Sequence, residues 1–407
     1  MRSKRYLLVP GNNSLSHVVK CLAISDALAK RGHEARVAVS KKHSAFLARL
    51  SHEYFVLPDI QENDESGFPS VEWFRQPQHI IDCINSEVDL LKAYQPDRVL
   101  GVFRFTLKTS AWITNVPYDS LICGCMIPES GETLGFAADE PGREMQQIIL
   151  DGFFRYAGAK VGAALPAFGL PKSNGDIRHM LKGEQTFLWD FPEFAPLKEM
   201  TGLVHVGPLV WDQWPFDVLD PHALIDGGRP LAVVAFGTCT VCLPTAKRLL
   251  RILVDMGYRV LLAAGGQKEF FNIMPEEPQV IAYSFAPLPT ILPHASLLVT
   301  HGGQMTVFEA LQHRVPVVVM PFQPEQAHNG VCLERMGCGI RLVPPQAFQG
   351  NPDIYIDALD RMTDDEIRSN ISGLVNNPMT TKRLADACEI IGRYGGVGKV
   401  AELMEEC

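Results

Sequence analysis

Runs of apolar residues that alternate with helical segments are the feature of this sequence that most limits its fold. In the first half, strand-like runs at Arg5–Pro10, Ala35–Ser40 and Arg98–Phe103 are separated by segments such as Leu15–Arg31 and His79–Tyr94, where apolar residues recur at helical spacing. Strands that are apolar on both faces are typical of a parallel sheet covered by helices. The same pattern predicts further strands at Glu53–Pro58, Asp119–Gly124, Thr186–Phe191 and Leu203–Val206.

The alternation begins again after a segment with little periodicity. Gly207–Pro230 contains four prolines, three glycines and two tryptophans, which predicts a linker. Strands are then expected at Leu231–Phe236, Arg259–Ala264, Val280–Phe285, Ser296–Thr300 and Val315–Met320. The predicted fold class is therefore α/β, with two doubly wound, Rossmann-like parallel-sheet domains that face each other across a cleft.

The predicted division follows this pattern. It gives an N-terminal domain over residues 1–206, a linker over 207–230, a C-terminal domain over 231–380, and C-terminal helices over 381–407 that pack back on the N-terminal domain. Pro128–Asp190 is less regular, with helical patterns broken by glycine and proline, and is a candidate pocket wall.

Composition excludes some classes of function. The chain has 407 residues, 46% of them hydrophobic, with a net charge of -9, which argues against general nucleic-acid binding. It contains no run of about 18 apolar residues, and Tyr6–Pro10 is too short for the core of a signal peptide, so we expect a cytoplasmic protein without a membrane span. Cys239 and Cys242 form a C-x-x-C pair, but no two further ligands at matching spacing suggest zinc.

The stretch VTHGGQMTVFEALQHRVPVVVMP, at Val299–Pro321, carries the most chemical information. An apolar strand leads into His301, Gly302 and Gly303, and a helix then begins. A helix N-terminus offers unpaired N–H groups and a positive dipole end, and glycines let an anion approach the backbone. This corner is a candidate phosphate cradle, in which His301 donates to a phosphate oxygen or instead caps the turn.

Other loops of interest also follow strands. Gly11–Ser16 and Gly237–Thr240 come after the first strand of each half, and ligands of open α/β sheets bind at the carboxyl ends of strands. Gly11 is followed by Asn12 and Asn13, so no G-x-G-x-x-G motif supports a dinucleotide-binding protein.

Four segments together carry a family resemblance. They are LPHASLLVTHGGQMTVFEALQHRVPVVVMPFQPEQAHN, FGT at Phe236–Thr238, SFAPLPTIL, and SHVVKCLAISDALAKRGHEARV. With these segments the chain resembles bacterial UDP/TDP-sugar glycosyltransferases of the two-domain GT-B fold, which include macrolide and antibiotic glycosyltransferases. The resemblance is more specific in the C-terminal half, and it implies that residues 1–206 bind an acceptor and residues 231–380 bind a nucleotide-sugar donor.

The resemblance also implies roles for single residues. Glu309 would accept from the ribose hydroxyls, although an exposed helix glutamate is the simpler alternative. Glu325 and Gln326 would bind the donor sugar, although Glu325 also suits a helix N-terminus. Phe285 would flank the base or belong to the core. The implied diphosphate contacts are Thr238, His301, Gly302, Gly303, Gln304, Met305 and Thr306. Nothing resembles a D-x-D motif, so no metal and no cofactor besides the donor are expected.

The implied reaction is metal-independent transfer with inversion, and it needs a base for the acceptor hydroxyl. His17 matches the family's catalytic histidine, although a helix N-terminal histidine without a task is the alternative. Val102 stands where the family has an aspartate that orients this histidine, Met305 where it has glycine, and Lys20 where it has proline. A further expectation is that Arg104 and Lys108 are solvated surface charges rather than ligands of an anionic acceptor.

Two alternatives remain beside the transferase. The Val102 and Met305 departures motivate a non-catalytic nucleotide-sugar-binding or accessory protein. A UDP-sugar 2-epimerase shares the two-domain layout, but it needs carboxylates around the sugar that the sequence does not reveal. The acceptor, the sugar, the choice of UDP or TDP and the oligomeric state stay open at this stage.

Overall fold

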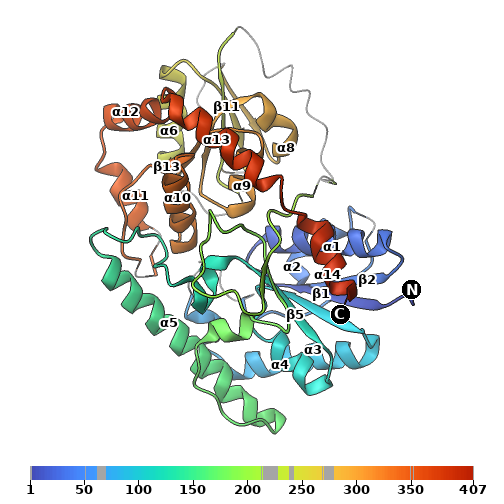
Figure 1. Ribbon diagram of the computed structural model, residues 1–407. Coiled ribbons are helices and arrows are strands. Elements are labelled where there is room, and N and C mark those ends of the chain that lie inside the picture. The colour runs from blue at the N-terminus through green and yellow to red at the C-terminus, as the bar shows by residue number, and fades with distance from the viewer. Residues whose placement is uncertain are drawn as a thin grey trace. The chain divides into compact units, whose positions relative to one another are not determined.

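The computed structural model forms two compact units (Figure 1). Unit 1 comprises Met1–Gly131, Ile148–Trp211 and Tyr394–Cys407, and unit 2 comprises Glu132–Gln147 and Asp212–Arg393. The structure describes residues 2–50, 52–61, 70–211, 213, 228–237, 243–267, 269, 279–348, 350–351 and 353–406. The division differs from the sequence-based one in three places. Residues 132–147 group with unit 2, the predicted linker is divided between the units after Trp211, and only residues 394–407 of the C-terminal helices group with unit 1.

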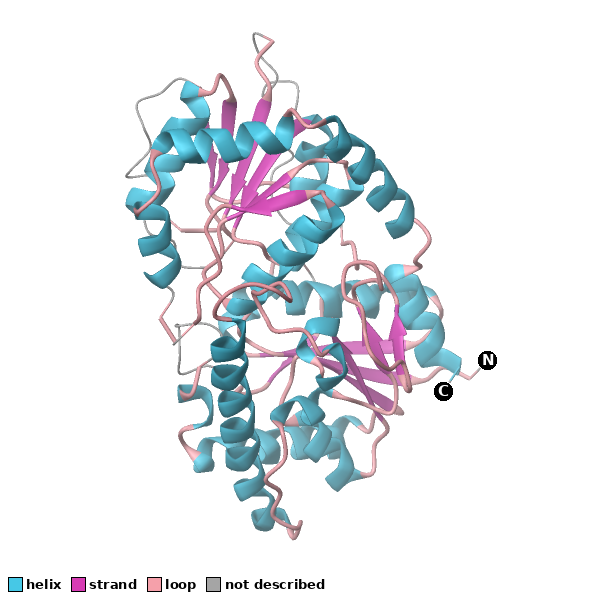
Figure 2. Cartoon of the chain, turned by 60° about the vertical axis from the view of Figure 1, so that its left-hand side comes forward, coloured by secondary structure: helices cyan, strands magenta, loops and turns pink. Residues whose placement is uncertain are grey.

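Unit 1 is built on a seven-stranded sheet in the order β3-β2-β1-β4-β5-β6-β7, and every pair of neighbours is parallel. The strands are β1 (Arg5–Pro10), β2 (Glu34–Val39), β3 (Tyr54–Val56), β4 (Arg98–Val102), β5 (Tyr118–Ile122), β6 (Thr186–Leu188) and β7 (Leu203–His205). Helices flank the sheet in Figure 2. The strand order reverses between β1 and β4, so the crevice outside their carboxyl ends is the expected ligand position.

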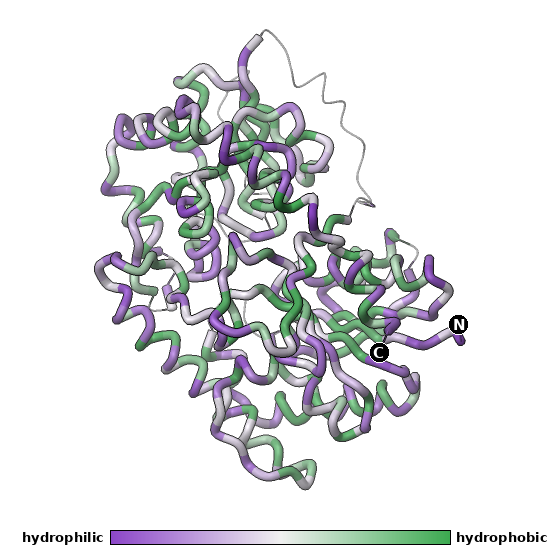
Figure 3. Tube along the Cα trace, in the orientation of Figure 1, coloured by the Kyte–Doolittle hydropathy of each residue, from purple (hydrophilic) through white to green (hydrophobic). Residues whose placement is uncertain are grey.

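The helices of unit 1 include those predicted at Leu15–Arg31 and His79–Tyr94. They are α1 (Leu15–Lys30), α2 (Lys41–Leu47), α3 (Pro77–Tyr94), α4 (Leu107–Thr114), α5 (Arg143–Ala164), whose first residues belong to unit 2, and α14 (Gly396–Glu406). The Ser14 side chain caps α1 by accepting from Ser16 N, and Gly32 follows its end with φ of 89°. Helix α5 lies inside the segment expected to be irregular, and its hydropathy alternates along its length (Figure 3).

Unit 2 contains a six-stranded parallel sheet in the order β10-β9-β8-β11-β12-β13. The strands are β8 (Leu231–Ala235), β9 (Arg259–Ala263), β10 (Val280–Tyr283), β11 (Ala295–Thr300), β12 (Val317–Val319) and β13 (Gly339–Arg341). The helices are α6 (Leu243–Asp255), α8 (Leu288–Ile291), α9 (Gln304–Gln312), α10 (Pro324–Met336), α11 (Asp353–Asp360), α12 (Asp364–Val375) and α13 (Pro378–Ile391). The order reverses between β8 and β11, and the predicted class of two doubly wound parallel sheets is confirmed.

The C-terminal segment forms two helices, α13 in unit 2 and α14 in unit 1. Helix α14 packs beside α1, and the Tyr6 hydroxyl donates to the Met404 carbonyl over 3.2 Å. Glu405 pairs with Arg31 at 2.6 Å and lies 3.3 Å from His33 Nε2. Among the helices that the structure describes, none is long and apolar enough to cross a bilayer.

Candidate functional site

The corner at His301 lies at the point in unit 2 where the strand order reverses. β11 ends at Thr300, α9 begins at Gln304, and Gly237 follows the neighbouring strand β8. A Cβ at Gly303 would lie 2.5 Å from His301 Nε2, and one at Gly237, whose φ is 64°, would lie 2.8 Å from its Cε1. Both positions require glycine because the imidazole rests directly against the backbone.

The environment of His301 keeps its side chain neutral. Burial lowers the pKa of His301 to about 4, although a hydrogen bond to the Ala235 backbone acts in the opposite direction. Nδ1 lies 3.4 Å from the Ala235 carbonyl oxygen and 3.3 Å from Thr300 Oγ1. Because a carbonyl can only accept, this contact favours a proton on Nδ1 and leaves Nε2 as an acceptor in the neutral ring. An anion that approaches Nε2 would therefore favour uptake of a second proton by the ring.

Gly302 is held from several sides. Its φ is 91°, and a Cβ there would lie 2.7 Å from Val319 Cγ1 and 2.8 Å from the Gln326 carbonyl oxygen. Asn329 Nδ2 donates to the Gly302 carbonyl at 2.8 Å and to Glu325 Oε1 at 3.1 Å. The fully buried Asn329 thus ties the glycine corner to α10. Asn329 was not predicted from the sequence, although it lies one helical turn after Glu325.

Helix α9 points its N-terminus at the same corner. Gly303 is the N-cap, and Gln304, Met305 and Thr306 form the first turn, so no N-cap side chain satisfies the helix's first N–H groups. Glu309 is only 6% exposed, which contradicts the alternative of a solvated helix glutamate. A buried carboxylate one turn further along α9 is suited to accept hydrogen bonds from a polyol.

The remaining predicted donor residues lie in the first turn of α10 and in the loop after β10, both in unit 2. Gln326 is buried, and its Oε1 accepts from Phe322 N at 2.9 Å, so this oxygen stabilises the loop before α10. The Phe285 ring rests on Gly266, where a Cβ would lie 2.8 Å from its Cζ. Thr238 lies outside the described residues, as do Cys239 and Cys242.

His17 lies in the first turn of α1, where the strand order of unit 1 reverses. It is 8% exposed, and its ring centroid lies 5.3 Å from that of Phe103 and 5.9 Å from that of Trp189. Burial, and then the charge of Lys20, lower the pKa of His17 to about 3, against a backbone hydrogen bond with Gly11. Lys20 Nζ lies 4.3 Å from the centroid of the Trp189 ring. His17 is therefore a neutral imidazole in an aromatic and cationic environment.

Within the described part of the chain, no carboxylate orients His17. Its buried Nδ1 makes no hydrogen bond with any residue that the structure describes. Val102 ends β4, and its carbonyl accepts from Gly11 N at 2.7 Å. Phe103 follows with φ of 53°, and its carbonyl oxygen would lie 2.4 Å from a Cβ at Gly11. A phenyl ring, not an acid, is thus the neighbour that this loop supplies to His17.

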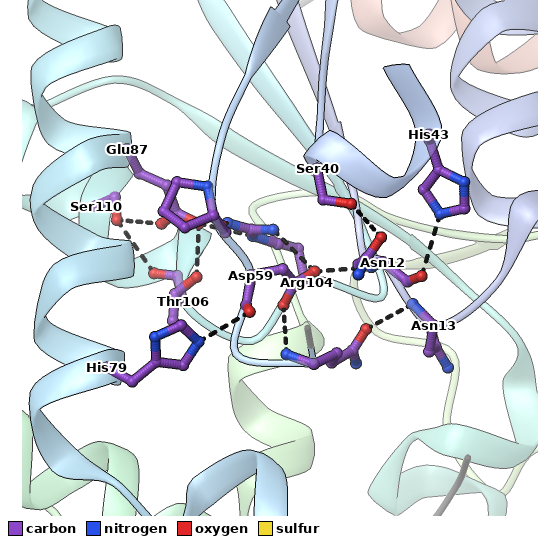
Figure 4. Close-up of polar contacts among 12 residues, drawn as sticks. Asn12, Asn13, Ser40, His43, Asp59, His79, Glu87, Arg104, Thr106 and Ser110 are labelled. Carbon is purple, nitrogen blue, oxygen red and sulfur yellow. Dashed lines mark hydrogen bonds and ion pairs between the residues drawn. The ribbon is translucent and has the colours of Figure 1, made fainter. Parts of the chain in front are cut away.

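Unit 1 contains a buried ionic cluster of Arg104, Asp59 and Glu87 (Figure 4). Arg104 is 2% exposed and contacts Asp59 Oδ2 at 2.9 Å through Nη1 and Glu87 Oε1 at 2.7 Å through Nε. The expectation that Arg104 is a solvated charge is wrong, because both of its partners are buried with it. Lys108 is half-buried and donates to the His179 carbonyl at 2.9 Å.

The same cluster fixes the loop before α1. Asp59 Oδ2 accepts from Asn12 N at 2.7 Å, and Gln61 Oε1 accepts from Asn13 N at 3.0 Å. His43 Nε2 lies 3.1 Å from the Asn12 carbonyl oxygen, and Figure 4 shows the Ser40 hydroxyl bonded to the Asn12 side chain. Residues after β2, β3 and β4 therefore hold the loop that leads from β1 to His17.

Sequence comparisons find relatives that are named as glycosyltransferases. The sequence model of the family described as "Erythromycin biosynthesis protein CIII-like, C-terminal domain" matches residues 247–393. The chain is 33% identical over 147 residues to the demethyllactenocin mycarosyltransferase of Streptomyces fradiae, which is 36% of this chain and 32% of that protein. It is 23% identical over 359 residues to a PGL/p-HBAD biosynthesis glycosyltransferase of Mycobacterium tuberculosis, which covers 84% of this chain and 81% of that protein.

Solved structures share the fold over the whole chain. The glycotransferase of kitacinnamycin has a TM-score of 0.73 at 18% identity, and the match covers 100% of this chain and 99% of that protein chain. SsfS6 of Streptomyces sp. SF2575, complexed with thymidine diphosphate, has a TM-score of 0.68 at 17% identity, and the match covers 99% of this chain and 100% of the SsfS6 chain. The fold is that of the GT-B glycosyltransferases, and the predicted resemblance to antibiotic glycosyltransferases is confirmed.

Proposed function

We propose that this chain transfers a sugar from a UDP- or TDP-sugar to a hydroxyl of a small-molecule acceptor. The observation that carries the proposal is the corner of His301, Gly302 and Gly303 at the N-terminus of α9. It combines donor N–H groups, glycines that admit an anion, and an imidazole that can gain a proton. The family match over residues 247–393 includes this corner, and the similar protein SsfS6 was crystallised with thymidine diphosphate.

The donor residues divide among the parts of the nucleotide sugar. The diphosphate would bind His301 Nε2 and the first-turn N–H groups of α9, with its charge balanced by the helix dipole and a protonated imidazole rather than by a metal. Glu309 would bind the ribose hydroxyls, Glu325 and Gln326 the sugar, and Phe285 the base. The residues proposed at the diphosphate are Thr238, His301, Gly302, Gly303, Gln304, Met305 and Thr306.

The proposed reaction inverts the anomeric carbon. The acceptor oxygen forms a bond to this carbon, the bond to the diphosphate oxygen breaks, and the hydroxyl proton passes to a ring nitrogen of His17. An imidazole with a pKa of about 3 is a weak base. We therefore expect the proton to move late, when bond formation has already made the acceptor oxygen acidic.

A second candidate function is nucleotide-sugar binding without turnover. It is favoured by the buried Nδ1 of His17, which makes no hydrogen bond with the described residues, and by Val102 in place of an aspartate. In catalytic histidines an acid on this nitrogen usually fixes the tautomer and stabilises the imidazolium.

Calorimetric titration with UDP, TDP and ADP, without added metal, tests both candidate functions. A donor-hydrolysis assay follows each titration. The variants are His301→Ala and His17→Ala, and the control is His294→Ala on the surface of unit 2. If the chain is a transferase, it should bind UDP or TDP selectively, and His301→Ala should weaken this binding about tenfold or more. His17→Ala should abolish turnover. Binding without turnover, unchanged in His17→Ala, would favour the second candidate, and no nucleotide binding would reject both.

A further inference from the structure

Helix α10 presents two metal-binding side chains on one face, neither of which the proposed function uses. His328 and Cys332 are one helical turn apart, and they are 1% and 0% exposed. Glu132, from the segment Glu132–Gln147 of the same unit, reaches this face. One ligand atom of each of the three residues lies within 4.8 Å of those of the other two.

His328 is poorly satisfied for a buried imidazole. Neither ring nitrogen makes a hydrogen bond of ordinary geometry with any of the described residues, and Nε2 lies 3.4 Å from Glu132 Oε2. Buried polar groups in folded proteins are nearly always hydrogen-bonded, so an exception such as this one points to a partner. A cation between the imidazole, the thiol and the carboxylate would supply that partner.

Arg335 orders the other side of the cluster. Its Nη1 donates to Glu132 Oε1 at 2.5 Å and its Nη2 lies 3.6 Å from Cys332 Sγ. This contact leaves the second carboxylate oxygen turned toward His328, as an outer-shell partner does for a metal ligand. The guanidinium also adds a positive charge, but its side chain is 36% exposed, so water screens it in part.

We propose that Glu132, His328 and Cys332 bind one zinc-class transition metal ion. A thiolate, an imidazole and a carboxylate suit Zn²⁺ or Co²⁺ and disfavour Mg²⁺ and Ca²⁺, which prefer oxygen ligands alone. Binding releases the Cys332 thiol proton, and any proton on His328, to solvent. Three protein ligands leave a fourth position for water.

The metal would fasten the segment Glu132–Gln147 to α10. This segment already contacts the helix, since a Cβ at Gly135 would lie 3.2 Å from that of Ala327, and Arg341 Nη1 donates to the Gly135 carbonyl at 3.0 Å. α10 begins with Pro324, Glu325 and Gln326, so the ion would rigidify the helix that carries the proposed sugar-binding pair. Its role is structural, and the proposal does not depend on the proposed function.

The competing occupant of the cluster is a proton. Burial lowers the pKa of His328, but Cys332 and Glu132 more than offset this effect and raise it to about 10. An imidazolium paired with Glu132 would therefore fill the same space without a metal.

The test titrates the chelator-treated full chain with Co²⁺ and then with Zn²⁺, and follows the near-ultraviolet thiolate-to-cobalt charge-transfer band. The variants are Cys332→Ser and His328→Gln. Cys338→Ser is the matched control, because Cys338 is a buried thiol just beyond the end of α10. Circular dichroism checks that each variant is folded, and the zinc content of the wild-type chain purified without chelator is an independent measurement.

We expect the wild-type chain to bind one Co²⁺ and to show the charge-transfer band, which Zn²⁺ should abolish. The control Cys338→Ser should show the same band, and Cys332→Ser should lack it. Affinity should fall about a hundredfold or more in His328→Gln, because loss of a ligand costs at least as much as loss of its outer-shell partner. Wild type without the band, or with binding equal to that of Cys332→Ser, would overturn the proposal and leave the proton as the occupant. Should the variants fail to fold, zinc below one tenth of an equivalent in the purified wild-type chain would overturn it too. UDP and TDP binding, measured on the same chelated sample, reports on the proposed function separately.

Discussion

Replacement of Arg104 by methionine tests whether the buried ionic cluster of unit 1 is a structural necessity. The substitution keeps much of the aliphatic volume and removes the charge between Asp59 and Glu87. Two carboxylates, 3% and 0% exposed, then remain without their cation. Removal of one partner from a buried ion pair costs about 3–5 kcal/mol of the free energy of unfolding, because the remaining charge is uncompensated.

The remaining hydrogen bonds place the expected cost at the lower end of this range. Asp59 still accepts from Asn12 N and Gln61 N, and Glu87 still accepts from the hydroxyls of Thr106 and Ser110. We therefore expect a loss of about 3 kcal/mol, which is a large part of the 5–15 kcal/mol typical of a folded protein.

Urea unfolding at pH 7, followed by far-ultraviolet circular dichroism, measures this loss. The matched control is Arg75→Met, which breaks an exposed pair with Glu72 in the same unit, where the arginine side chain is 70% exposed. This control should cost less than about 1 kcal/mol. Combining Arg104→Met with Glu87→Gln should restore part of the stability, because one uncompensated charge disappears. A loss below about 1 kcal/mol for Arg104→Met, or one equal to the control, would refute the reasoning.

Three shorter predictions concern other residues. Gly303→Ala should weaken UDP or TDP binding about tenfold in calorimetry, because its Cβ would lie 2.5 Å from His301 Nε2; unchanged affinity would contradict the proposed cradle. Because the pKa of His17 is about 3 when folded and 6.5 in its unperturbed state, the unfolded chain gains the proton first as the pH falls below 6.5, so stability is lost on acidification. Urea unfolding should show that the free energy of unfolding of the wild type falls by about 1 kcal/mol more than that of His17→Asn between pH 7 and 5.5. Equal losses in the two chains would count against a buried neutral imidazole. Thr363→Ala removes the capping box of α12 and should cost about 1 kcal/mol in thermal unfolding; an unchanged midpoint would show that the cap is dispensable.

The parallel sheets were predictable because their strands are buried on both faces and therefore read as short apolar runs. The strand β13 was not predicted, because Gly339–Arg341 is only three residues long and begins with glycine. Helix α5 was obscured by its own glycines. At Gly158 and Gly162 a Cβ would lie 1.7 Å from the carbonyl oxygens of Gly175 and Ser173, so these glycines let another backbone cross the helix.

Parts of the site followed from chain order alone, since a loop after a parallel strand must lie at the carboxyl edge of the sheet. His17 and His301 were located in this way. The contacts of Arg104 with Asp59 and Glu87 join three separate segments, and no spacing in the sequence encodes them. The surroundings of His17 were equally hidden, because Phe103 follows β4 and Trp189 follows β6, far apart in the sequence.

The return of residues 394–407 to unit 1 has a consequence for synthesis on the ribosome. The Tyr6 hydroxyl donates to the Met404 carbonyl, so strand β1 cannot make this contact until α14 has been synthesised. Unit 2 ends at Arg393 and has all its residues earlier, although part of unit 1 precedes it in the chain. Unit 2 is therefore complete before unit 1, and until α14 emerges the side of α1 that it covers is open to contacts with other molecules.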